Sequence, residues 1–319
     1  MPVNADKTGQ WKADIAASVD FYNDWFMKYA PQAFRETRQK TIKQVKSALD
    51  ATDGMRRVSP AVLRRNPRVL AVLRMATAPP LAVDRLIGLA GVPPNLVRRM
   101  EKRGDLPPRM KKGDVERGLK SIGEMIRALS DMDIFVWLER GVEPSEQEIY
   151  RASTIVADRL CGAIANPIIR NAQEQRQLAK IRKWLEEHGY TFIEAGMGTR
   201  VDAMRPGTFC FHLNVPVEQE SGREVNIPVD VAVMPRKLEG RAMPLLVEAK
   251  SAGDFTNTNK RRKEEVVKIA QLRATYGQEI DYILFLCGYF DSGYLGYEAA
   301  EGIDWVWEHR MDDLAQFGL

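Results

Sequence analysis

The sequence predicts an α/β (α+β) protein, with a mixed β-sheet core flanked by helices and an all-helical region at the N-terminus. Two observations predict this fold. Up to Gly189, apolar residues recur mainly at helical spacing. After Gly189, runs of alternating or continuous apolar residues, separated by charged and glycine-containing turns, are typical of β-strands. One helical pattern lies among these runs, so we expect a sheet with a crossover helix.

The N-terminal helices are predicted from apolar periodicity and from proline. Aromatic and aliphatic residues between positions 11 and 29 fall at helical spacing. Pro31 interrupts this pattern, because proline inside a helix removes a hydrogen bond, and a second helix is expected from Phe34 to Leu49. A long helical region begins at Glu146, and the same reasoning places an interruption near Asn166-Pro167.

The segment GVEPSEQE, residues 141–148, marks a domain boundary because it is polar and contains turn residues. We therefore expect a helical domain over residues 1–150 and an α/β domain over residues 151–319. A chain of 319 residues is long enough for two domains with separate cores.

Positive charge is concentrated in one part of the helical domain. The chain has a net charge of +4, yet residues 56–112 alone hold 14 Arg or Lys residues against three acidic residues. A basic block beside an acidic remainder indicates a polyanionic partner. A membrane surface is a weaker interpretation, because the block alternates with Pro and Gly and forms no long amphipathic helix.

Within the basic block, residues 81–104 have the pattern of a helix-turn-helix. Two short helices are expected on either side of a turn at Gly91, and the second helix begins with proline. Side chains of the second helix are candidates for contact with DNA. These candidates are Arg98, Arg99, Lys102 and Arg103. The alternative is a solvated basic face on a helical bundle.

Several classes of protein are not expected. No apolar run approaches the roughly 20 residues that cross a bilayer, and the N-terminus has no signal-peptide core, so we expect no membrane association and a cytoplasmic location. Cys161, Cys210 and Cys287 lie far apart in apolar contexts and are expected to be buried free thiols. The three histidines form no spaced pair, so neither a zinc enzyme nor a histidine-driven triad is expected.

The candidate chemistry lies between Asn226 and Ser251. This stretch reads as two strands joined by a basic turn, with Asp230 in the first and Glu248-Ala249-Lys250 at the end of the second. Because side chains alternate along a strand, Glu248 and Lys250 point the same way, and pairing of the strands brings Asp230 to the same edge. Two carboxylates can then hold a hard divalent cation, with a lysine beside the phosphate that is attacked.

Other catalytic motifs are missing from the sequence. It contains no GxxxxGK[ST] phosphate-binding loop, no nucleophile elbow and no HExxH. An acid-x-lysine pair is common by chance, but its place at the end of an apolar strand strengthens the interpretation. Asp230, Glu248 and Lys250 are therefore the candidate catalytic residues.

These three residues resemble the PD-(D/E)XK nuclease motif, and residues 165–319 look like the catalytic core of a type II restriction endonuclease. In more detail, the chain is similar to the XamI-type restriction endonucleases over most of its length. The segments that carry this similarity are LVEAKSAGDFTNTNKRRKEE and IDWVWEHRMDDL. One departure from the motif is Pro228, which stands two positions before Asp230 rather than directly before it.

The resemblance implies a restriction-endonuclease-like sheet and Mg²⁺-dependent hydrolysis of double-stranded DNA at a short palindromic site. It implies that Asp230 and Glu248 ligate the metal, with the Ala249 carbonyl as a further ligand. Lys250 is then expected to orient or deprotonate the attacking water, and a purely structural salt bridge to Glu248 is the alternative. Glu174, on the helix before the strands, is either an auxiliary acid or part of a solvated helix face.

The polar segment after the second strand is a candidate reader of DNA. Asn can bond adenine and Arg can bond guanine in the major groove, whereas contact with phosphates alone is the alternative. The candidate residues are Thr256, Asn257, Thr258, Asn259, Lys260, Arg261 and Arg262. Four residues near the C-terminus are expected to serve packing instead. They are Trp305, Trp307, His309 and Arg310.

The same resemblance implies partners. A palindromic site requires a two-fold homodimer, and a restriction-modification system pairs the nuclease with a DNA methyltransferase in a prokaryotic cytoplasm. The domain over residues 1–150 is then expected to embrace DNA or to form the dimer. Two rival hypotheses are a repair or structure-selective nuclease on the same core, and a non-catalytic helix-turn-helix regulator.

Overall fold

The computed structural model describes residues 2–196, 199–219, 222–237, 243–278 and 280–319, without the side chains of residues 257 and 259–263. The chain forms two compact units. One unit combines Met1–Tyr29 with Arg170–Leu319, and the other contains Ala30–Ile169. The expected division at residue 150 is not the division between these units, because the first 29 residues pack with the C-terminal half of the chain.

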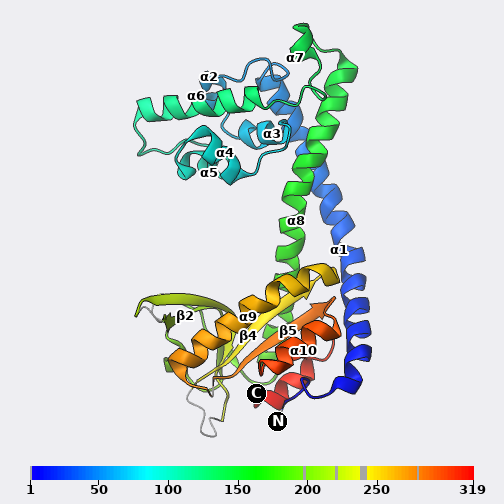
Figure 1. Ribbon diagram of the computed structural model, residues 1–319, viewed down its shortest axis with the longest axis vertical. Coiled ribbons are helices and arrows are strands. Elements are labelled where there is room, and N and C mark those ends of the chain that lie inside the picture. The colour runs from blue at the N-terminus through cyan, green and yellow to red at the C-terminus, as the bar shows by residue number, and fades with distance from the viewer. Residues whose placement is uncertain (1, 197–198, 220–221, 238–242, 279) are drawn as a thin grey trace. The chain divides into compact units, whose positions relative to one another are not determined.

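Two long helices pass from one unit into the other. Helix α1 spans Thr8–Ala51 and helix α8 spans Glu146–Glu187 (Figure 1). Both are continuous, so the interruptions expected at Pro31 and Pro167 are wrong. Each proline is exposed, where water can satisfy the carbonyl that loses its intrahelical partner.

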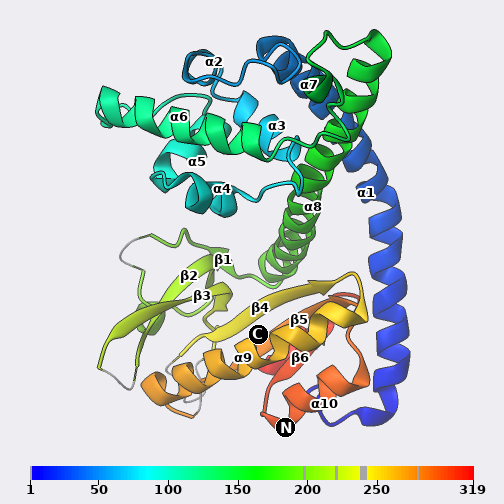
Figure 2. The ribbon, with the colours of Figure 1, turned by 45° about the horizontal axis from the view of Figure 1, so that its top comes forward.

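The helical unit surrounds its own apolar core, to which α1 and α8 each contribute a segment. Its shorter helices, seen in Figure 2, are α2 (Pro60–Arg65), α3 (Val69–Met75), α4 (Val83–Ala90), α5 (Pro94–Lys102), α6 (Lys112–Ala128) and α7 (Trp137–Arg140). The expected pair of helices around Gly91 is confirmed by α4 and α5. Gly91 ends α4 with φ +61°, a left-handed conformation that favours glycine.

The second unit is built on a six-stranded mixed sheet, which confirms the expected fold class. In order across the sheet, the strands are β1 (Thr191–Phe192), β2 (Thr208–Glu218), β3 (Glu224–Val233), β4 (Leu245–Ala252), β5 (Tyr282–Gly288) and β6 (Asp304–Trp307). Strands β2, β3 and β4 pair antiparallel, whereas β4, β5 and β6 pair parallel. The parallel pairs are connected through α9 (Phe255–Tyr276) and α10 (Ser292–Ala300), of which only the first was expected.

Helices cover both faces of this sheet. On one face, α8 and the 3₁₀ helix η2 (Met311–Phe317) pack on the sheet, through residues that include Leu178, Leu185 and Leu314. On the other face lie α9, α10 and the first turns of α1, with Leu272, Leu295 and Trp11 in the core. Strand β5 is buried along its whole length, as an apolar strand with helices on both sides must be.

Strands β2 and β3 change direction together at one point. Phe211 pairs with Val231 and Leu213 pairs with Val229, but His212, which lies between the paired positions, has φ +52°. Phe209 belongs to the core beneath α8, while Leu213 belongs to the core beneath α9. The sheet therefore curls at His212, and its odd-numbered side chains pass from one core to the other.

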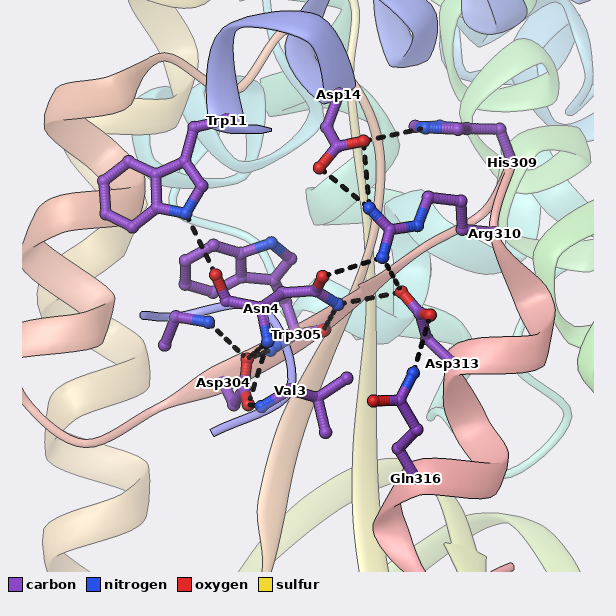
Figure 3. Close-up of polar contacts among 11 residues, drawn as sticks. Val3, Asn4, Trp11, Asp14, Asp304, Trp305, His309, Arg310, Asp313 and Gln316 are labelled. Carbon is purple, nitrogen blue, oxygen red and sulfur yellow. Dashed lines mark hydrogen bonds and ion pairs between the residues drawn. The ribbon is translucent and has the colours of Figure 1, made fainter. Parts of the chain in front are cut away.

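The N-terminus is fixed to the end of the chain by polar contacts (Figure 3). The Asp304 carboxylate accepts hydrogen bonds from the backbone N–H groups of Val3, Asn4 and Ala5, at 3.0 Å for Asn4 and Ala5. The Asn4 amide donates to the Trp305 carbonyl at 2.8 Å. These contacts explain why the first residues belong to the sheet unit.

The expectations about the tryptophans, Arg310 and the cysteines are confirmed. Trp305 and Trp307 are completely buried, and Arg310 pairs with Asp14 at 3.0 Å, so these residues serve packing. The three cysteines are buried and free. In the part of the chain that the structure describes, no helix has the length and apolar character needed to cross a membrane.

Candidate active site

The register of β3 and β4 brings two carboxylates together. Val231 pairs with Val247, which places Asp230 across from Glu248 at the next position of the ladder. The Asp230 Oδ2 atom accepts a hydrogen bond from the Ala249 N–H at 2.9 Å. The carboxylate of Asp230 is therefore held against the strand that carries the acid-x-lysine sequence.

A second acid and a histidine lie on another side of Asp230. Ligand atoms of Glu174, His212 and Asp230 all lie within 4.8 Å of one another. His212 faces Asp230 across the β2–β3 ladder, and Glu174 reaches the site from α8. Glu174 therefore lies close to Asp230, whereas Glu248 is not a member of this close group.

Glu248 instead faces two lysines. Its side chain is only 9% exposed, and its Oε1 atom lies 3.1 Å from the Lys250 Nζ atom and 2.7 Å from the Lys268 Nζ atom. Its Oε2 atom is buried and has no hydrogen-bond partner among the described residues. Lys268 comes from α9, and the sequence contained no signal for its position because the helix had to be placed on the sheet first.

A buried acid on α9, Glu265, also contacts Lys250. Its Nζ atom lies 2.6 Å from Glu265 Oε1, and the Tyr282 hydroxyl donates to Glu265 Oε2 at 2.6 Å. Glu265 is completely buried on α9. Nearby Glu298 is also buried, and burial together with the charge of Glu265 raises the pKa of its carboxyl to about 8.

The charges of the site influence one another. Burial raises the pKa of Asp230, while the Ala249 N–H and Lys250 act in the opposite direction. Burial also raises the pKa of Glu248, against the effect of Lys250. For Lys250, burial by itself lowers the pKa, but the two acids Glu248 and Glu265 outweigh it and leave the pKa above its ordinary value. Lys250 is therefore a cation in this arrangement.

The donor set fits a hard divalent cation. Asp230 and Glu248 offer carboxylate oxygens, the ligands that Mg²⁺ prefers. The buried Glu248 Oε2 atom has no other partner in the described part of the chain, and a buried carboxylate oxygen without a partner is costly. A cation beside it would remove that cost. The backbone N–H of Ala249 is already used by Asp230.

The predicted DNA-reading segment forms the start of helix α9. This helix begins at Phe255, because the Asp254 carboxylate accepts a hydrogen bond from the Thr256 N–H and caps the first turn. Thr256 is exposed. Thr258 is buried and its hydroxyl donates to the Phe255 carbonyl, so this residue is not available for a DNA groove.

The side chains of the other predicted readers lie outside the described residues. They are Asn257, Asn259, Lys260, Arg261 and Arg262, of which the structure describes only the helical backbone. The segment follows β4 almost directly, so its backbone starts close to the end of the strand that bears Lys250.

The basic residues on α5 belong to the helical unit. Arg98 is exposed and pairs with Asp84 at 3.0 Å, and Arg99 pairs with Asp105. Lys102 and Arg103 are exposed. One arginine of the basic block, Arg74, is buried and makes a two-pronged contact with Glu101 at 2.6 and 2.8 Å, so it stabilises the fold.

Comparison with known proteins identifies the family of the chain. Residues 53–307 match the model of the family described as XamI restriction endonuclease. The chain belongs to this restriction endonuclease family. Its match includes β3, β4 and α9, and therefore Asp230, Glu248 and Lys250.

A full-length relative supports the family assignment. The chain is 52% identical over 318 residues to the type II restriction enzyme SalI of Streptomyces albus G, which covers 99% of each chain. These matches confirm the expected class of enzyme, a type II restriction endonuclease. A solved structure, protein VC1899 of Vibrio cholerae, aligns over 91% of this chain and 57% of its own with 13% identity. Its TM-score of 0.27 is too low to support an argument.

Proposed function

We propose that this restriction endonuclease hydrolyses phosphodiester bonds of double-stranded DNA at a short palindromic site, with Mg²⁺ as cofactor. The observation that carries the proposal is the half-buried Asp230 and the buried Glu248 beside the cationic Lys250, in a chain of this family. When bound, Mg²⁺ would supply a Lewis acid for the phosphate and a water of lowered pKa.

The protein's own groups have distinct roles in this proposal. Asp230 and Glu248 hold the cation through carboxylate oxygens, with the Ala249 carbonyl as a further ligand. Lys250 orients the attacking water and offsets the negative charge of the phosphate, because its two acid neighbours keep it protonated and therefore unable to accept a proton. Glu174 adds a carboxylate close to Asp230.

DNA contacts are proposed for two helices. The first turns of α9 offer Thr256, Asn257, Asn259, Lys260, Arg261 and Arg262. Helix α5 and the residue after it offer Arg98, Arg99, Lys102 and Arg103, in a helix pair of the helix-turn-helix type. Residues from both units would then contribute to DNA binding.

The biological setting follows from the same proposal. A palindromic site calls for a two-fold homodimer. A DNA methyltransferase of the same specificity would protect the host, and both enzymes would act in a prokaryotic cytoplasm.

A plasmid assay tests the proposed reaction. With Mg²⁺, the protein is expected to cut unmethylated plasmid into discrete fragments, and sequencing of the fragment ends would give the site and the stagger. Asp230→Asn retains the shape of the side chain but removes its charge, so cleavage should fall by at least roughly a hundredfold while DNA binding persists. Random fragment ends, or an Asp230→Asn protein that cuts normally, would contradict the proposal.

A further inference from the structure

Side chains from two other elements meet Asp230 in a way that the nuclease motif does not require. Glu174 comes from α8, His212 from β2 and Asp230 from β3, with ligand atoms within 4.8 Å of one another. No side-chain hydrogen bond or ion pair of Glu174 or His212 is found in the described part of the chain. Two acids are thus close together, and among the described residues the Glu174 carboxylate forms no ion pair with a lysine or arginine.

The strand pairing and the backbone conformation of β2 determine where His212 lies. It stands opposite Asp230 in the β2–β3 register, and its φ of +52° occurs at the curl of the sheet. A left-handed conformation costs a residue other than glycine roughly 1 kcal/mol or more. His212 is exposed and lines a surface pocket with Phe192, Phe211 and Arg182, so small solutes can reach the imidazole.

Glu174, His212 and Asp230 offer a different set of ligand atoms from Asp230 and Glu248, because the first set includes an imidazole nitrogen. Mg²⁺ prefers oxygen ligands, whereas an imidazole nitrogen favours first-row transition metals, whose affinity rises from Mn²⁺ through Co²⁺ to Ni²⁺. Ligands on opposite sides of such an ion are roughly 4 Å apart. A separation of at most 4.8 Å therefore lets all three groups reach one ion after a small movement of the side chains.

We propose that Glu174, His212 and Asp230 form a second cation site that binds a divalent transition metal, such as Mn²⁺ or Co²⁺, through the imidazole of His212. The inference deepens the proposed function and rests on it, since Asp230 is shared with the Mg²⁺ site. His212 is thus assigned a role as a metal ligand that the Asp-Glu-Lys motif does not give it.

Binding of Co²⁺ to the DNA-free protein tests this site without reference to cleavage. Isothermal titration of His212→Asn should give at least roughly tenfold weaker binding than the unchanged protein. Asn is chosen because it tolerates positive φ better than most residues, so the curl of the sheet is kept. His188→Asn is the matched control, because His188 is an exposed histidine of the same unit that stacks on Trp184, and this variant should bind Co²⁺ normally.

A second variant tests whether weaker Co²⁺ binding by His212→Asn comes only from a change in the backbone of β2. Glu174→Gln changes α8 rather than β2, and it should weaken Co²⁺ binding by a similar factor if the two residues hold one ion. Equal Co²⁺ affinity in His212→Asn and the unchanged protein, or no Co²⁺ binding at all, would overturn the inference. Loss of cleavage in Asp230→Asn alongside normal Co²⁺ binding by His212→Asn would leave the nuclease proposal intact and reject only this one.

Discussion

At the scale of single residues, two acids surround the ammonium group of Lys250, so in our proposal this lysine acts as a cation rather than as a base. Two acids, Glu248 and Glu265, lie 3.1 and 2.6 Å from its Nζ atom. The expected alternative, a salt bridge between Lys250 and Glu248, is present, and it accompanies rather than replaces a catalytic role in our proposal. The second acid, Glu265, determines where the ammonium group lies.

We predict that Glu265→Gln slows DNA cleavage by roughly a hundredfold, because displacement of a reacting group by about 1 Å has a cost of that size. The amide is a weaker partner for Lys250, while Tyr282 can still donate to the amide oxygen. Single-turnover cleavage should show the lower rate, and DNA affinity measured in Ca²⁺ should change little.

Glu264→Gln is the control for this prediction, because Glu264 is the exposed neighbour of Glu265 on the same helix. It should cleave at the normal rate. A Glu265→Gln protein that is as active as Glu264→Gln, with equal thermal stability, would remove Glu265 from the role of positioning Lys250.

At the scale of elements, the α4–α5 pair is the part of the helical unit for which we propose contact with DNA. Helix α5 buries Leu96, Val97 and Met100, which leaves its basic side chains on the opposite face. Arg98 and Arg99 already have acid partners, whereas Lys102 and Arg103 are exposed, and no ion pair of either is found in the described residues.

We predict that the double variant Lys102→Ala with Arg103→Ala weakens DNA binding and makes it less dependent on salt. Each lost phosphate contact lowers the slope of log affinity against log salt by about 0.9. The slope should therefore fall by roughly two, as measured by fluorescence anisotropy in Ca²⁺ over a series of salt concentrations. Lys183→Ala, which removes an exposed charge from α8, should leave the slope unchanged, and an equal effect of both variants would contradict the prediction.

The two long helices illustrate how proline patterns are overridden. Pro31 and Pro167 were expected to end helices, yet α1 and α8 continue through them. Both prolines stand close to the points where the chain passes between the compact units, after Tyr29 and after Ile169. The two prolines therefore lie near the division between the units, although neither of them ends a helix.

At the scale of the whole molecule, the first residues of the chain pack into the core of the unit that contains the sheet. Asp304 anchors residues 3–5, the buried Asn4 contacts Trp305 and Asp313, and the Trp11 indole donates to the Asn4 carbonyl at 3.0 Å. The ring of Trp11 also packs edge-on against Trp305, with centroids 5.6 Å apart. Residues distant in sequence thus form one core.

We predict that Asp304→Ala loosens this anchor by about 1–3 kcal/mol, the cost of leaving buried N–H groups without an acceptor. Hydrogen exchange of peptides over residues 2–14 should become faster, since Val3, Asn4 and Ala5 lose their acceptor. Asp133→Ala, an exposed aspartate of the other unit, should leave exchange in this segment unchanged. Unaltered protection in Asp304→Ala would show that the contacts of Asn4 and Trp11 hold the N-terminus without Asp304.

The sequence by itself determined the elements that carry the motif. Alternation of apolar residues located β2, β3 and β4, and the charged end of an apolar strand identified Glu248 and Lys250. The Asp230 position followed from pairing of the two strands, and the register confirms that pairing. These features are local, because side-chain direction in a strand depends only on its neighbours along the chain.

Only the tertiary structure decided which other residues join the site and which residues form each unit. His212, Glu265 and Lys268 are distant in sequence from Asp230, Glu248 or Lys250, and the curl of the sheet and the docking of α9 bring them close. The N-terminal segment joined the sheet for the same reason, through Asp304 and Trp305. Contacts of this kind depend on the packing of whole elements, which periodicity along one segment does not encode.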